Sequence, residues 1–132
     1  MKQLLISLGF LCLMTACKKE AGEGGNSVIQ GKILERTYTA FPTNYSVKAA
    51  LEKDVYIIYG EDNSTFDDRT RTSFDGSFKF EFLRKGKYRI FVYSQDTFLT
   101  NNFAKEVPIF LDAEIKKNKS EVNLSTVTTI NL

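Results

Sequence analysis

The 132-residue sequence predicts an all-β fold, a Greek-key β-sandwich of about seven strands. From Val28 onward the apolar residues recur mostly at every second position, which is the period of a strand with one buried face. Eleven Phe and six Tyr, both of which favour strands, stand against no Trp. Turn residues separate the alternating runs at spacings typical of a sandwich. The expected strands are residues 28–36, 54–60, 69–74, 77–82, 87–94, 106–114 and 121–131.

Residues 36–54 interrupt this pattern between the first two expected strands. The segment is long for a connection inside a compact domain, and Phe41-Pro42 breaks it near its middle. Ser46 could cap a single helical turn that ends at Leu51. The sequence therefore predicts a long connection that contains one helical turn.

The first twenty residues have the composition of an export signal. Lys2 precedes an apolar run from Leu4 to Met14, and small residues follow it. An apolar run of this length is too short to span a bilayer, so it indicates a cleaved secretory signal and not a membrane helix. Residues 1–16 are expected to be a signal peptide.

The end of this run, Leu13-Met14-Thr15-Ala16-Cys17, resembles the lipobox of bacterial lipoproteins. In that family the signal is cut just before the Cys, which is then acylated. The resemblance implies a lipid on Cys17, palmitate included, and a place in the cell envelope, expected at the outer membrane with its face undecided. The alternative is ordinary signal cleavage with an incidental Cys17, which Met14 fits poorly.

The cysteine count agrees with lipid attachment. Cys12 lies inside the apolar run, so the mature chain would keep only Cys17. A single Cys cannot form an internal disulfide, and an exported protein with one unpaired thiol needs a use for it. Residues 17–27 are charged and Gly-rich, which predicts a flexible tether ahead of a sandwich domain at 28–132.

Asp75-Gly76 stands between two alternating runs and predicts a two-residue hairpin of type I′. The alternative, a catalytic Asp75, is disfavoured because Asp-Gly suits the geometry of that turn. After the turn, three Phe residues are expected to share the buried face and two charged residues the solvent face. The buried set is Phe78, Phe80 and Phe82, and the solvent set is Lys79 and Glu81.

The same stretch resembles the carboxypeptidase regulatory-like domain, a transthyretin-like β-sandwich of bacterial surface proteins. Its motif is present as Thr72, Asp75, Gly76, Phe78, Phe80, Leu83, Gly86, Tyr88, Ile90 and Val92. The resemblance covers about residues 28–94 and implies a non-catalytic module. Two features depart from the family: the first connection is longer than usual, and Tyr93-Ser94-Gln95 replaces a Gly-aromatic pair.

Composition argues against several functions. The net charge of +2 mixes both signs along the chain, which does not favour a nucleic-acid partner. The absence of His removes the commonest zinc ligand and the usual general base, so we expect no cofactor, no metal and no enzyme activity. The loop 60–68 offers Asp62, Asn63, Asp67 and Asp68 to a Ca²⁺ ion, but without EF-hand spacing, which favours a solvated turn.

Two expected strands are apolar on both faces, which is unusual for a sandwich. With their alternate residues inward, Tyr56, Ile58, Phe91 and Tyr93 point outward. If the strands are neighbours, these four residues form an aromatic stripe, a candidate patch for binding a protein or a sugar. The alternative is that residues 36–54 fold over the stripe and build a second small core with Phe41, Tyr45, Val47 and Leu51.

Three functional hypotheses follow. The first is a lipid-anchored envelope protein whose non-catalytic sandwich binds or assembles with a partner. The second is a carbohydrate-binding accessory lipoprotein that uses the aromatic stripe. The third is a carboxylate-dependent hydrolase, which needs two carboxylates converging in a cleft; the acidic residues here are scattered over expected turns and outer faces.

Overall fold

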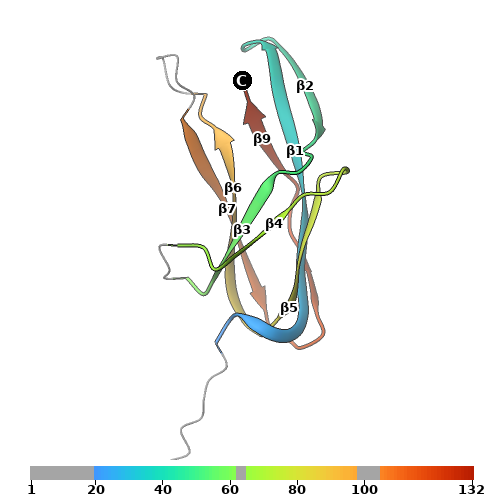
Figure 1. Ribbon diagram of the computed structural model, residues 1–132, viewed down its shortest axis with the longest axis vertical. Helices are drawn as coiled ribbons and strands as arrows, with labels where there is room; N and C mark the ends of the chain where they lie inside the picture. The colour runs from blue at the N-terminus through green and yellow to red at the C-terminus, as the bar shows by residue number, and fades with distance from the viewer. Residues whose placement is uncertain (1–19, 62–64, 98–104) are drawn as a thin grey trace, which may run out of the picture.

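The computed structural model describes residues 20–61, 65–97 and 105–132, and it confirms the predicted β-sandwich (Figure 1). The described residues form two sheets and contain no helix that could cross a membrane. The strands are β1 (Glu23–Ala40), β2 (Asn44–Ala49), β3 (Asp54–Tyr59), β4 (Asp68–Arg71), β5 (Ser77–Leu83), β6 (Gly86–Gln95), β7 (Glu106–Ile115), β8 (Glu121–Asn123) and β9 (Val127–Asn131).

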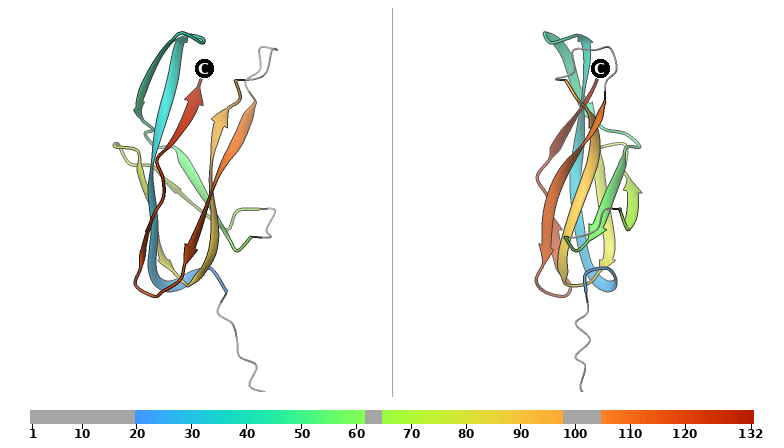
Figure 2. Two further views of the ribbon diagram at one scale, coloured as in Figure 1. Left: turned by 180° about the vertical axis from the view of Figure 1, so that it is seen from behind. Right: turned by 90° about the vertical axis from the view of Figure 1, so that its left-hand side faces the viewer.

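The first sheet is organised around β1, which runs the length of the sandwich (Figure 2). The first half of β1 pairs with β5 on one side, antiparallel, and with β8 on the other, parallel. Its second half pairs with β2, antiparallel, and with β9, parallel. The predicted strand 121–131 is thus divided into β8 and β9, which accompany the two halves of β1.

The second sheet has the strand order β4-β3-β6-β7 and is antiparallel throughout. In its centre β3 and β6 are direct neighbours, with Tyr56 opposite Phe91. Near the C-terminus the two sheets are joined by a hydrogen bond in which the Ile130 N–H donates to Ser94 Oγ at 2.9 Å.

The inner faces of the two sheets enclose one hydrophobic core. Burying each large side chain in it stabilises the fold by about 1.5–3 kcal/mol. The thirteen buried residues of the core are Ile29, Ile33, Ala50, Val55, Ile57, Phe78, Phe80, Leu83, Tyr88, Ile90, Val92, Ile115 and Val127.

The predicted helical turn from Ser46 to Leu51 is wrong. Residues 44–49 form β2, which extends β1 as an antiparallel hairpin. Tyr38 of β1 lies 5.6 Å from Tyr45 across the hairpin and 5.0 Å from Phe41 at its tip, measured between ring centroids. All six β2 residues are in register with β1, so this edge strand gains ladder hydrogen bonds along its whole length, whereas an isolated helical turn fixes several residues for a single bond.

The expected flexible tether at 17–27 is also wrong for residues 20–27; residues 17–19 lie outside the described part. Strand β1 begins at Glu23, Ala21 packs against the core, and the Gly22 N–H donates to Tyr88 Oη at 3.0 Å. A Cβ on Gly25 would lie 2.0 Å from the carbonyl oxygen of Leu83. Gly25 therefore permits close approach of two backbones, and residues 21–25 are part of the folded sandwich.

Asp75-Gly76 forms a turn, as predicted, but not the predicted hairpin. The Gly76 N–H donates to the carbonyl of Ser73, and φ is positive at Gly76 but not at Asp75, which excludes type I′. The turn joins β4 in one sheet to β5 in the other. The Asp75 carboxylate accepts hydrogen bonds from the Ser77 N–H and hydroxyl, which lower the pKa of Asp75.

The predicted inward triplet of β5 is wrong in its last member. Phe78 and Phe80 are buried, but Phe82 has φ +58° and points to solvent, and Leu83 takes the inward place. The pairing of β5 with β1 shifts register at this point, which breaks the strict alternation. Lys79 and Glu81 are solvated, as predicted, and form an ion pair at 2.7 Å.

Candidate functional site

The outer face of the β4-β3-β6-β7 sheet carries the predicted stripe. Tyr56 and Ile58 alternate with the buried Val55 and Ile57 on β3, and Phe91 alternates with the buried residues of β6. Because β3 and β6 are hydrogen-bonded neighbours, the structure brings together the side chains that the sequence singled out.

The stripe is part of a larger group of five rings, called here the aromatic cluster: Tyr56, Phe66, Phe91, Tyr93 and Phe110. Phe91 stacks on Tyr56 with 4.9 Å between ring centroids and 14° between ring planes. Phe91 also lies 5.6 Å from Tyr93 and 5.5 Å from Phe110, and Phe66 lies 4.8 Å from Tyr56. Phe91, in the middle, is 7% exposed, whereas Tyr93 is 38% and Phe110 50% exposed.

The alternative in which residues 36–54 cover the stripe is wrong. Most of that segment forms the β1–β2 hairpin in the other sheet, where Phe41 and Tyr45 remain exposed. Phe91 has ring neighbours from β3 and β7 and from its own strand. Phe91 and Ile58 are therefore buried parts of the face, and Tyr93 and Phe110 present accessible rings.

A polar hollow of about 300 Å³ adjoins the aromatic cluster. It is lined by Tyr56 and Tyr93 together with three charged residues, Lys53, Asp54 and Glu106. The Asp54 carboxylate is held by Arg71 at 2.9 Å and faces Arg69 at 3.8 Å. This places two phenol rings beside fixed hydrogen-bonding groups, an arrangement that can bind a ligand with both apolar and hydroxyl-bearing surfaces.

Two charged residues border the other side of the cluster. Arg89 on β6 is ion-paired with Asp112 on β7 at 2.8 Å, which raises the pKa of Arg89. The same guanidinium lies 5.5 Å from the centroid of the Phe110 ring, within the range of a cation–π contact. Arg89 thus lies beside Phe110 on the outer face of the sheet.

The hydrolase hypothesis would need its carboxylate pair in a cleft, and Asp54 and Glu106 are the acidic residues that line this hollow. Asp54 is engaged in the two arginine ion pairs. The Asp54 carboxylate therefore has a structural role: its ion pairs orient Arg69 and Arg71 on the edge strand β4.

Two further predicted sites, the acidic loop 60–68 and Cys17, lie partly or wholly outside the described residues. In the acidic loop, Asp62 and Asn63 lie outside the described residues, and the Asp67 carboxylate accepts a hydrogen bond from the Tyr59 N–H at 2.7 Å. Within the described ranges, no three His, Cys, Asp or Glu side chains are grouped as metal ligands. Cys17 also lies outside the described residues.

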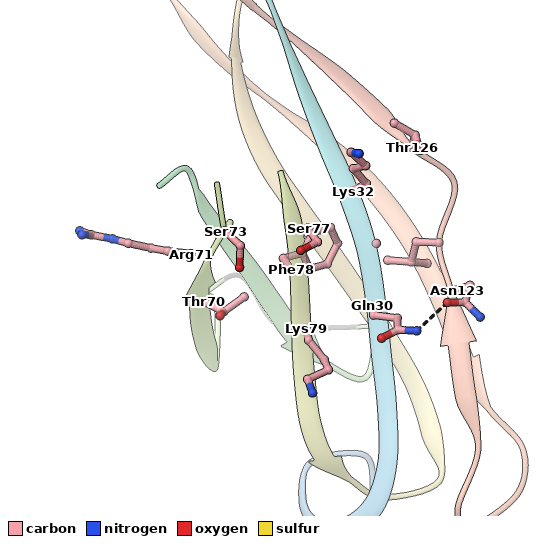
Figure 3. A pocket seen from close by; sticks show the side chains of 12 residues that line it. Gln30, Lys32, Thr70, Arg71, Ser73, Ser77, Phe78, Lys79, Asn123 and Thr126 are labelled. Atoms are coloured by element: carbon pink, nitrogen blue, oxygen red, sulfur yellow. Dashed lines mark hydrogen bonds between the residues drawn. The ribbon is translucent and has the colours of Figure 1, made fainter. Parts of the chain in front are cut away.

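A larger hollow of about 680 Å³ lies beside β5, between β4 and the first sheet (Figure 3). Its lining is mostly polar, and a hydrogen bond of 2.8 Å joins Gln30 to Asn123 there. Its aromatic residue, Phe78, is buried in the core, and Arg71 extends away from the other labelled side chains. The larger hollow therefore lacks the accessible ring faces of the aromatic cluster.

Several residues of this face were not predicted from the sequence. Phe110 belongs to a third run that is apolar on both faces, 107–111, so its alternation could have revealed it. Phe66 lies outside any strand, and nothing in its local pattern places it against Tyr56. Of the three charged residues of the hollow, Lys53 and Asp54 are adjacent at the start of β3, and Glu106 at the start of β7 joins them only through the sheet pairing.

No family model matches this sequence, and no curated protein matches it. Among solved structures, the chain is similar to the crystal structure of a "putative carbohydrate binding protein" from Pseudomonas aeruginosa. The identity is 11%, the TM-score is 0.48, and the match covers 84% of this chain and 92% of the other.

Proposed function

We propose that this β-sandwich is a non-catalytic binding module, and that it binds its ligand on the outer face of the β4-β3-β6-β7 sheet. The observation that carries the proposal is the hollow in which Tyr56 and Tyr93 meet Lys53, Asp54 and Glu106. Accessible aromatic rings on a soluble domain often mark a site of interaction. The resemblance to the carboxypeptidase regulatory-like domain remains a prediction that agrees with a non-catalytic role.

A saccharide is the ligand class that this hollow suits best. The C–H face of a sugar ring can pack on a phenol ring, while its hydroxyl groups accept from Lys53 or donate to Asp54 and Glu106. The ion pairs of Asp54 with Arg71 and Arg69 hold that acceptor in place before the ligand arrives, which reduces the cost of ordering it.

The replacement Tyr93→Ala is expected to weaken saccharide binding by at least about 30-fold, because truncating an aromatic anchor at a site centre costs about 2 kcal/mol. Calorimetric titration of the purified protein with a panel of neutral and acidic oligosaccharides measures this. Tyr45→Ala is the matched control, since Tyr45 is an exposed Tyr on the β1–β2 hairpin. Equal affinities of the two variants would contradict the proposed site.

A protein partner is the second candidate, because accessible aromatic surface extends beyond the hollow to Phe110 and Phe66. In that case mild crosslinking in cells, followed by purification, should recover a defined protein with the wild type. The Phe110→Ala variant should lose this protein, and Tyr45→Ala should keep it. Failure of the panel to yield a ligand, together with such a partner, would favour assembly over saccharide binding.

We also propose that Cys17 carries the lipid that attaches this module to the cell envelope, expected at the outer membrane. The support is the lipobox-like run that ends at Cys17, and the folded domain that starts only a few residues later. Metabolic labelling with an alkyne analogue of palmitate should mark the wild type and not Cys17→Ser. The matched control, Cys12→Ser, should keep its label; a labelled Cys17→Ser protein would refute lipid attachment at this residue.

A further inference from the structure

One end of the sandwich combines three segments that are distant in sequence. Residues 20–27, the β5–β6 turn and the β7–β8 turn lie together there, and the C-terminus lies at the opposite end (Figure 1). The Arg84 N–H donates to the carbonyl of Gly22 at 2.8 Å, and the Lys119 N–H donates to Asn26 Oδ1 at 3.0 Å. These bonds make this end one continuous surface, called here the basic end.

Cations outnumber acids on the basic end. Its six cations are Arg84, Lys85, Lys87, Lys116, Lys117 and Lys119, and its five acids are Glu20, Glu23, Glu61, Glu114 and Glu121. Lys87 and Lys116 are paired with the nearby Glu61 and Glu114. Among the described residues no ion pair involves Arg84, Lys85, Lys117 or Lys119. At the other end, the hairpin segment 38–45 contains no charged residue.

The basic end also contains a recess of about 400 Å³. It is lined by Arg84, Lys85, Asn118 and the Gly24–Asn26 segment. Gly24 has φ +95°, and a Cβ there would lie 3.2 Å from a guanidinium nitrogen of Arg84. The missing side chain leaves space beside a guanidinium, an ammonium and an amide, groups that bind phosphate oxygens.

We propose that the basic end docks on the anionic surface of the membrane and that this recess accepts a lipid headgroup phosphate. The orientation rests on the proposed lipid at Cys17. From Cys17 to Ala21 a fully extended chain reaches at most about 14 Å, so the lipid would hold this end against the bilayer. That distance is comparable to a Debye length of about 8–10 Å, so the cations interact with the surface charge.

Vesicle flotation tests the docking apart from the lipid. The protein that begins at Cys17, with its thiol capped, retains the whole core, because every core residue lies between Ile29 and Val127. It should float with vesicles in which roughly one third of the phosphatidylcholine is replaced by phosphatidylglycerol, and not with phosphatidylcholine alone. Raised salt should release it from the anionic vesicles.

The triple variant Lys85→Gln, Lys117→Gln, Lys119→Gln is expected to lower the partition coefficient about 100-fold, since each cation at an anionic surface contributes about a factor of five. The matched control is Lys32→Gln, Lys48→Gln, Lys105→Gln, which removes the same charge from exposed positions elsewhere and should change binding by much less. The same partition coefficient for the two triple variants would overturn the docking surface.

Further outcomes distinguish membrane docking from general anion binding and from the proposed lipid on Cys17. Binding to soluble polyglutamate without binding to anionic vesicles would overturn the membrane as the partner of the basic end. Because the thiol is capped, vesicle binding does not depend on acylation. Loss of docking with intact palmitate labelling would therefore refute only this inference, whereas intact docking without labelling would refute only the lipid on Cys17.

Discussion

Replacing Phe80 by Ala is expected to lower the free energy of unfolding by about 3–5 kcal/mol, the usual cost of truncating a fully packed Phe. Phe80 is 4% exposed, lies opposite Ile29 of β1, and its ring is 6.1 Å from that of Phe78. The loss has two parts. The variant lacks the favourable free energy that the wild type gains by transferring the Phe80 ring from water into the core, and a cavity is left between the two sheets. Urea denaturation of the protein that begins at Cys17 measures it.

Phe82→Ala is the matched control, because it makes the same chemical change two residues further along the same strand. Phe82 is 69% exposed, so its truncation is expected to change the free energy of unfolding by only about 0.5 kcal/mol. The positive φ of residue 82 is present in both the wild type and the variant and does not enter the comparison. Similar losses for Phe80→Ala and Phe82→Ala would show that Phe82 is buried like Phe80, and that the alternation of β5 is not broken before Leu83.

Gly76→Ala is expected to cost at least about 2 kcal/mol of unfolding free energy, for two reasons that add. Gly76 has φ +81°, a backbone conformation that L-residues adopt at a cost. An added Cβ would also lie 2.2 Å from the carbonyl oxygen of Ile33, whose N–H donates to the carbonyl of Gly76 at 2.8 Å. The clash is with backbone, so rotation of a side chain cannot relieve it.

Gly60→Ala separates the two contributions. Gly60 has φ +86°, close to that of Gly76, but a Cβ there would meet no atom within 4 Å. Its cost should be the conformational part alone, about 1 kcal/mol. The excess for Gly76→Ala, read from the same denaturation experiment, is then the energy of the contact with β1. Equal costs at the two glycines would show that the turn moves away from Ile33 freely.

Most strands were predictable because one buried face imposes a period of two on the chain. Strand β3 begins at Asp54 as expected, and β6 and β7 differ from the expected ranges only at their ends. Where alternation failed as a guide, a long-range contact explains the failure. Phe82 points outward because the register with β1 shifts, and residues 44–49 pair with the end of a strand that runs well past the expected Arg36.

The glycines ahead of Ser27 show the limit of composition as a signal. A charged, Gly-rich segment next to an export signal resembles a linker, and locally nothing distinguishes a flexible Gly from one that allows close packing. Only the fold places Gly25 against the carbonyl of Leu83 and Gly22 against Tyr88. As a result the domain begins several residues earlier than expected, and its first residues form part of the basic end.

Some residues of the candidate site could be predicted from the sequence, and others could not. Tyr56, Ile58, Phe91 and Tyr93 could be named from the sequence, because apolar residues on both faces of a strand are visible in one short window. The burial of Phe91, the contribution of Phe110 and Phe66, and the hollow beside Tyr93 could not, because each depends on which strands are neighbours.

By itself the sequence determined the fold class, the inward residues of most strands and the lipobox-like run at Cys17, because each depends on the order of nearby residues. The tertiary structure alone decided which outward rings stay accessible, which charges line the hollow, and which cations share an end with the start of the domain. Those properties depend on pairings between segments that lie tens of residues apart. No local pattern of residues indicates which of these segments pair.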